Sequence, residues 1–145
     1  MKNLLLATSA VAMMAGAAFA DGHTEEVKIG VILGFTGPLE SITPAMGAGA
    51  ELAMAEVTES GALLGGAKVT SVRGDSTCID AGAATAAAER LVTSDNVDAI
   101  MGADCSGVTG AILQNVARPN GVAMISPSAT SPGLSTAEDD DLYFR

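Results

Sequence analysis

Short apolar runs alternate with segments of helical periodicity along this 145-residue chain, and this alternation constrains the fold more than any other feature. The predicted strands cover residues 27–33, 68–73, 97–101 and 121–125, and the predicted helices cover residues 44–60, 81–92 and 106–118. Parallel strands joined through helices are connected by right-handed crossovers. The sequence therefore predicts an α/β fold with an open, doubly wound parallel sheet and helices on both faces.

Several residues at the ends of the predicted helices favour these boundaries. Gly61 follows the first helix, where glycine commonly ends a helix in the left-handed conformation. Asp80 and Ser106 stand at the starts of the second and third helices, and we expect both to be N-caps. Asp75 and Asp80 flank Cys78, but a strand-end acid and a capping residue explain them better than a pair of catalytic carboxylates.

The first twenty residues have the pattern of a secretory signal peptide. Lys2 supplies a positive start, residues 4–14 form a short apolar run, and residues 18–20 give the small-x-small pattern of a cleavage site. The apolar run is too short for a retained membrane anchor, which is the weaker alternative. We therefore expect a signal peptide at 1–20, a mature chain at 21–145, and export to an oxidising compartment.

The predicted mature chain is strongly acidic. Without Lys2 it holds six Lys and Arg residues against seventeen Asp and Glu, a formal charge near −11. Nucleic acids and anionic lipid surfaces reward a basic face, so both are disfavoured as partners. About 125 residues would suffice for one domain. Residues 142–145, however, open a further apolar strand with nothing after it to pair or cover it, which is typical of a fragment.

Cys78 and Cys105 are the two cysteines of the chain. In an exported protein an even pair favours a disulfide over a metal or redox site. The loop that this bond would close, about 27 residues long, predicts a chain-entropy stabilisation of about 3–4 kcal/mol.

The residues needed for common catalytic sites are missing from the sequence. His23 is the single histidine and lies in the lead of the mature chain, so a Ser-His-Asp triad or a histidine-containing zinc site cannot be assembled. The turn at 34–38 lacks the spacing of a dinucleotide fingerprint, and no phosphate loop occurs. We therefore expect no enzymatic activity, no catalytic residues, no metal and no cofactor.

Two hydroxyl-rich segments follow neighbouring predicted strands. Ser106 lies in the segment 105–109, and Ser128 and Thr130 lie in the segment 126–132. Loops at the carboxyl ends of parallel strands line the crevice where small ligands bind. A helix N-terminus at Ser106 offers unpaired N–H groups to a carboxylate without a cationic side chain. The amide of Thr130 can donate to the same carboxylate, and its hydroxyl and the Ser128 carbonyl can accept from an ammonium.

Capping and turn formation explain the same residues without any ligand. Ser, Thr and Pro are common at helix starts and in turns, where their side chains bind nearby backbone groups. On these residues alone, this alternative is favoured over ligand binding.

A resemblance to a known family reverses that preference. The motifs that carry it are Ile29-Gly30-Val31, Thr36-Gly37-Pro38, Gly49-Ala50-Glu51-Leu52-Ala53, Gly65-Gly66, the segment 75–80 with Cys78, Ala88-Glu89-Arg90-Leu91-Val92, and the segments 102–106 and 126–132. In their order and spacing they resemble the branched-chain amino acid (leucine/isoleucine/valine) binding proteins of ABC transporters. The similarity extends over essentially the whole mature chain.

The resemblance implies a type I periplasmic binding fold of two lobes that close on a ligand, of which residues 21–145 supply the N-terminal part of the first. It implies that Cys78 is bonded to Cys105, that Ser106 and Thr130 bind the carboxylate of an amino acid, and that Ser128 and Thr130 bind its ammonium. The implied partners are a small amino-acid-like ligand and an ABC permease in the inner membrane, and the implied location is the periplasm.

Two questions about function stay open at this point. Relatives often place an aromatic residue soon after the Thr-Gly-Pro turn, and residues 39–43 contain none. Either Ile42 walls an apolar pocket, or one of Glu40 and Ser41 indicates a polar or cationic ligand. The alternative to an importer subunit is the extracellular sensor domain of a signalling receptor, which uses the same fold.

Overall fold

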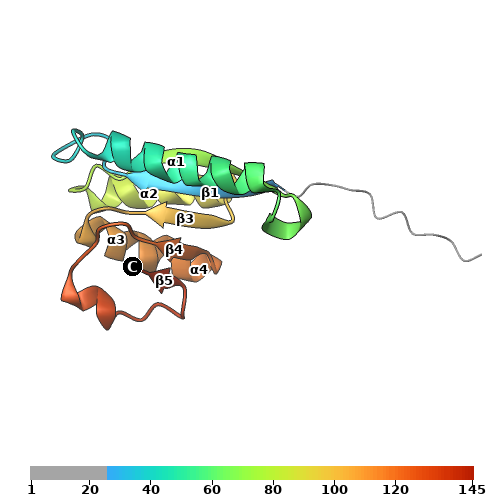
Figure 1. Ribbon diagram of the computed structural model, residues 1–145. Helices are drawn as coiled ribbons and strands as arrows, with labels where there is room; N and C mark the ends of the chain where they lie inside the picture. Colours follow the sequence, from blue (N-terminus) through green and yellow to red (C-terminus); the bar gives the residue numbers. More distant parts are fainter. Residues whose placement is uncertain (1–25) are drawn as a thin grey trace, which may run out of the picture.

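The computed structural model describes residues 26–145, so the predicted signal peptide at 1–20 and His23 lie outside the described residues. Five parallel strands form one sheet in the order β2-β1-β3-β4-β5 (Figure 1). The strands are β1 (Glu26–Leu33), β2 (Lys68–Asp75), β3 (Ala99–Gly102), β4 (Ala123–Ile125) and β5 (Tyr143–Phe144). The four predicted strands are therefore confirmed, with ends that shift by up to two residues.

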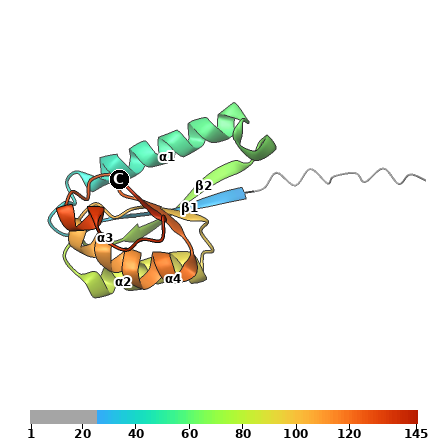
Figure 2. The same cartoon turned by 90° about the horizontal axis from the view of Figure 1, so that it is seen from below.

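Helices cover both faces of the sheet (Figure 2). The helical elements are α1 (Thr43–Ser60), η1 (Leu63–Gly65), α2 (Ala81–Thr93), α3 (Ser106–Ile112), a π-helical turn η2 (Leu113–Ala117), α4 (Arg118–Asn120) and η3 (Pro132–Ser135). On one face lies α1, and α2, α3 and α4 lie on the other. The predicted doubly wound α/β architecture is confirmed.

The central strand β1 shows why the two faces differ in their helices. Successive side chains of a strand point to opposite faces. Val31 and Leu33 belong to the cluster that includes Met54 of α1, and Ile32 belongs to the larger cluster that includes Leu91 of α2. All three β1 side chains are fully buried. The continuous apolar run of β1 is therefore the sequence signature of a strand covered on both sides.

Two of the three predicted caps are confirmed. Gly61 ends α1 with a left-handed backbone conformation. The Asp80 carboxylate accepts hydrogen bonds from the amides of Gly82 and Ala83, both at 2.9 Å. The prediction that Ser106 is an N-cap is wrong. The extended backbone and the carbonyl of Cys105 start the helix, since that carbonyl accepts from the amide of Thr109 at 2.9 Å.

The last segment of the chain has a pairing partner that the sequence analysis did not expect. β5 pairs with β4 in parallel register, with Met124 opposite Tyr143 and Ile125 opposite Phe144. The connection from β4 to β5 passes through η3 and an acidic turn, so β5 pairs with a strand that lies about twenty residues earlier in the sequence.

Among residues 26–145, none of the helices combines the length and the apolar character needed to cross a bilayer.

Candidate functional site

The site that the sequence predicts lies at the carboxyl ends of the central strands. The chain leaves β1 toward α1 on one face of the sheet and leaves β3 toward α3 on the opposite face. In doubly wound sheets, the divergence of two such loops opens a crevice at the strand ends. Ser106 begins α3 directly after β3, and Ser128 and Thr130 follow β4, the neighbour of β3. The topology therefore brings the three predicted residues to one edge of the sheet.

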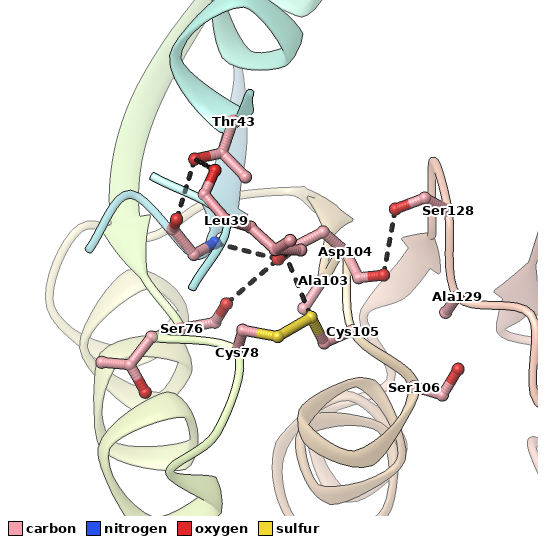
Figure 3. Close-up of a disulfide and its surroundings, with 12 residues drawn as sticks. Leu39, Thr43, Ser76, Cys78, Ala103, Asp104, Cys105, Ser106, Ser128 and Ala129 are labelled. Atoms are coloured by element: carbon pink, nitrogen blue, oxygen red, sulfur yellow. Dashed lines mark hydrogen bonds between the residues drawn. A yellow bond between two sulfur atoms is a disulfide. The ribbon is translucent and has the colours of Figure 1, made fainter. Parts of the chain in front are cut away.

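A disulfide joins two of the loops at this edge (Figure 3). Cys78, in the loop after β2, is bonded to Cys105, the residue before α3, and their Cα atoms are 5.2 Å apart. The pairing that the sequence predicts is thus present. Because Ser106 directly follows Cys105, the bond fixes the start of α3 relative to the end of β2.

Asp104 connects four strand ends around that disulfide. Its buried carboxylate accepts hydrogen bonds from the amide of Gly34 at 2.9 Å and from the Ser76 hydroxyl at 3.3 Å. Gly34 lies at the end of β1, and Ser76 lies at the end of β2 (Figure 3 shows the Ser76 contact). Its carbonyl accepts from the Ser128 hydroxyl at 2.9 Å, in the loop after β4. Asp104 therefore holds the Ser128 loop in place relative to β1, β2 and β3, and the sequence analysis did not single it out.

The hydroxyl of Ser106 contacts the loop that carries Thr130. Its Oγ accepts hydrogen bonds from the amides of Thr130 and Ser131, both at 3.0 Å. A serine oxygen has two lone pairs and one hydrogen, so these contacts use both of its acceptor positions. Within residues 26–145 the hydrogen of the Ser106 hydroxyl has no acceptor. Ser106 is thus a donor oriented by two backbone amides.

This contact changes what the Thr130 loop offers. The Thr130 amide was predicted to face a ligand carboxylate, but in the structure it donates to the Ser106 hydroxyl oxygen. The Thr130 side chain is exposed, and its hydroxyl makes no hydrogen bond within the described part of the chain. Ser126, at the base of the loop, is buried and accepts from the amide of Ala129 at 2.9 Å. The loop is therefore internally supported and presents the Thr130 hydroxyl outward.

A pocket of about 290 Å³ lies against this loop. It is lined by Ser126, Pro127, Ser128, Ala129, Thr130 and Arg145. Four of these residues offer hydroxyl or guanidinium groups, and Arg145 adds a positive charge. We had expected a site without a cationic side chain. Arg145 was not predicted at the site, because no motif surrounds it and its proximity to the loop depends on the pairing of β5 with β4.

The loop after β1 lies at the same edge of the sheet, and Asp75 anchors it. The Asp75 carboxylate accepts from the Thr36 hydroxyl at 2.6 Å and from the amide of Thr77 at 2.8 Å. Burial alone would raise the pKa of Asp75, but the hydrogen bonds from Thr36, Thr77 and Phe35 outweigh it, and the pKa lies below its ordinary value. Asp75 therefore stays ionised and ties the Thr36 turn to the end of β2.

The geometry of that turn requires glycine at position 37. Gly37 has a φ of 94°, and a Cβ atom there would lie 2.7 Å from the Thr77 carbonyl oxygen. Farther along the loop, the Ile42 side chain is 52% exposed just before α1. Ile42 is therefore available to a ligand, as one of the two open alternatives requires.

One group of residues in the described part of the chain brings metal-binding atom types together. The sulfur atoms of Cys78 and Cys105 lie near the carboxylate of Asp104. The two sulfurs are bonded to each other, so they offer no thiolate, the form of cysteine that binds metals. This group is a structural cross-link, and it does not suit a metal ion.

Comparisons with known proteins agree with this architecture. The sequence profile described as "Periplasmic binding protein" matches residues 26–143. The chain belongs to the periplasmic binding protein family. A curated relative, the Leu/Ile/Val-binding protein homolog 7 of Brucella suis, is 32% identical over 143 residues, which cover 99% of this chain and 34% of the relative. The Leu/Ile/Val-binding protein BraC3 of Rhizobium johnstonii is 30% identical and covers 91% of this chain and 35% of its own length.

Solved structures extend the agreement to three dimensions. The branched-chain amino acid transporter substrate binding protein LivJ of Streptococcus pneumoniae, in complex with isoleucine, superposes with a TM-score of 0.73 at 33% identity. The match covers 83% of this periplasmic binding protein chain and 33% of that structure. An ABC transporter substrate-binding protein of Desulfitobacterium hafniense in complex with Leu gives a TM-score of 0.70 at 27% identity. The chain thus spans about a third of the length of the relatives it matches.

Proposed function

We propose that this chain is part of the substrate-binding component of an ABC importer and that it binds an amino acid or a related small solute. The supporting observation is the Ser106 hydroxyl, whose oxygen accepts from two backbone amides and whose hydrogen has no acceptor within residues 26–145. Such a group is ready to donate to an anionic oxygen of a ligand. The names of the relatives, which are binding proteins for Leu, Ile and Val, support the ligand class.

In this proposal the predicted residues act as a set at the edge of β3 and β4. Ser106 donates its hydroxyl hydrogen to the ligand carboxylate, and the exposed Thr130 hydroxyl donates to the same group. The carbonyl of Ser128 and the Thr130 oxygen accept from the ligand ammonium. Residues 21–145 serve as the N-terminal lobe, and the signal peptide at 1–20 directs export to the periplasm. The binding protein then delivers its ligand to a membrane permease.

Calorimetric titration of the protein expressed from its complete gene tests the proposal. The titrants are a panel of amino acids, their amides and small carboxylates, and we expect saturable binding to at least one amino acid. Absence of heat from the whole panel would argue against the proposed function.

Matched variants test the assigned residues. Thr130→Ala should weaken binding by about 1–3 kcal/mol because a charged ligand group loses a hydrogen-bond donor. Ser106→Ala should weaken it at least as much, since the change also removes the acceptor of two amides. Thr85→Ala is the control, because the Thr85 hydroxyl binds the carbonyl of Ala81 within α2. Equal affinity of all three variants and the unmodified protein would remove Ser106 and Thr130 from the site.

A further inference from the structure

Strand pairing places Arg145 beside the Thr130 loop. The register of β5 on β4 sets Phe144 opposite Ile125, and the carbonyl of Phe144 accepts from the amide of Ser126 at 2.9 Å. Arg145 directly follows Phe144, the last paired residue of β5, and therefore lies beside the start of the loop that follows β4. Its side chain lines the pocket of about 290 Å³ together with residues 126–130.

The guanidinium of Arg145 binds the carbonyl groups on either side of Thr130. Its Nη1 atom donates to the carbonyl of Ala129 at 3.2 Å and to the carbonyl of Ser131 at 3.0 Å. Its Nη2 atom donates to the hydroxyl of Ser135. A single nitrogen thus bridges two carbonyl oxygens that flank Thr130. Hydrogen bonds from a cationic donor are stronger than those between neutral groups.

Arg145 binds carbonyl groups of this turn, whereas Ser106 binds its amide groups. Its Oγ binds the amides of Thr130 and Ser131, and Arg145 binds the carbonyls of Ala129 and Ser131. The backbone around Thr130 is therefore fixed from both sides, through its donors and through its acceptors.

We propose that Arg145 is a positioning residue of the ligand site, which fixes the 129–131 turn so that Thr130 presents its hydroxyl to the ligand. This inference rests on the proposed function, because it assumes that a ligand binds at the site. The fixing of the turn, in contrast, can be measured without any ligand. Loss of the guanidinium frees two carbonyls and lets the turn sample other conformations. The ligand then has to bear the ordering cost of the loop, and its affinity falls.

The structure suggests a sharp set of variants. Arg145→Met keeps an unbranched side chain and removes the donors and the charge. Arg145→Lys restores a cationic nitrogen, and because one guanidinium nitrogen makes both carbonyl contacts, an ammonium can reproduce them. Arg90→Met is the control, since the Nη2 atom of Arg90 donates to the carbonyl of Arg73 at 2.9 Å, on the far side of β1 and β3 from the loop. It removes the same charge and the same kind of contact to a carbonyl, together with an ion pair to Asp95.

The experiment measures amide hydrogen exchange by NMR and amino acid affinity by calorimetry, on the protein expressed from its complete gene. In Arg145→Met we expect the amides of Thr130 and Ser131 to exchange at least tenfold faster, and affinity to fall about tenfold. Arg145→Lys should recover most of both, and Arg90→Met should change neither.

The two readouts separate the possible failures. Unchanged exchange at Thr130 and Ser131 in Arg145→Met would overturn the positioning role, whatever the affinity. Faster exchange with unchanged affinity would also overturn it, because the turn would then be irrelevant to the ligand. Faster exchange in Arg145→Met together with no binding by the unmodified protein would instead reject the proposed function and leave the fixing of the turn by Arg145 in place.

Discussion

The carboxylate of Asp75 shows how one residue couples a loop to the sheet. It receives hydrogen bonds from the hydroxyl and amide of Thr36 and from the amide of Thr77, and its pKa is lower than in an unfolded chain. A group with a lowered pKa in the folded state stabilises that state while it is ionised. Protonation removes this contribution.

Asp75→Asn should therefore change both stability and its dependence on pH. At neutral pH we expect the free energy of unfolding to fall by about 1–2 kcal/mol, because the charged acceptor is lost. The stabilisation by Asp75 is complete above the pKa of an unfolded aspartate, about 3.9, and disappears as the pH falls through the lower folded-state value. Denaturant titrations between pH 7 and about pH 2 should show a flatter acid limb for the variant. Glu89→Gln, at an exposed position of α2, is the control. Identical acid limbs for Asp75→Asn and the unmodified protein would contradict the assignment.

Single residues were predictable from the sequence where a local motif defines them. Asp80 precedes an alanine-rich helix and caps it as expected. Asp104 and Arg145 escaped prediction because their partners, Gly34 and the Ala129 carbonyl, come close only through strand pairing. Ser106 was expected at the site, but its contact with the Thr130 amide depends on how two loops meet, which no local pattern encodes.

At the scale of elements, the disulfide is the cross-link between two strand-to-helix loops. It joins Cys78 after β2 with Cys105 before α3 across a separation of 27 residues. Replacing both cysteines by serine should lower the free energy of unfolding by about 3–4 kcal/mol, the chain-entropy value for a loop of this length. Thermal unfolding of this variant, compared with the unmodified protein in oxidising and in reducing buffer, measures the effect.

The reducing buffer supplies the control for that comparison. The unmodified protein should approach the stability of the double variant once the bond is reduced, and the double variant should not respond to the reductant. A loss below about 1 kcal/mol would show that the bond adds little constraint to the unfolded chain.

Elements were predicted well because each has its own periodic signal. α1 and α2 agree with their apolar spacing and capping residues, and the boundaries differ by one residue. The third helix was predicted as a single helix over residues 106–118, yet its second half, Leu113–Ala117, is a π-helical turn. Hydrophobic periodicity does not distinguish such a turn from an α-helix over five residues. The pairing of β5 was not predictable either, because its two residues are too short for a pattern.

At the scale of the whole molecule, α1 covers only part of its face of the sheet. The register aligns Val31, Met101, Ile125 and Phe144 in one row across β1, β3, β4 and β5. Exposure rises along this row from 0% at Val31 to 54% at Ile125 and 55% at Phe144. Beside α1 the row borders an apolar groove of about 540 Å³. Contiguous apolar surface of this kind is uncommon on a soluble monomer.

The polypeptide 21–145 should therefore bind an apolar fluorescent dye such as ANS and associate with itself as its concentration rises. Ile125→Ser removes an exposed apolar side chain that lines the groove, and it should reduce dye fluorescence and shift sedimentation toward the monomer. Ile79→Ser is the matched control, since Ile79 is 76% exposed in the loop before α2 and lies outside the groove. The two variants remove the same kind of side chain from different places. An equal effect of both would mean that the dye binds exposed apolar side chains in general. An effect of Ile125→Ser alone would locate the dye in the groove beside α1.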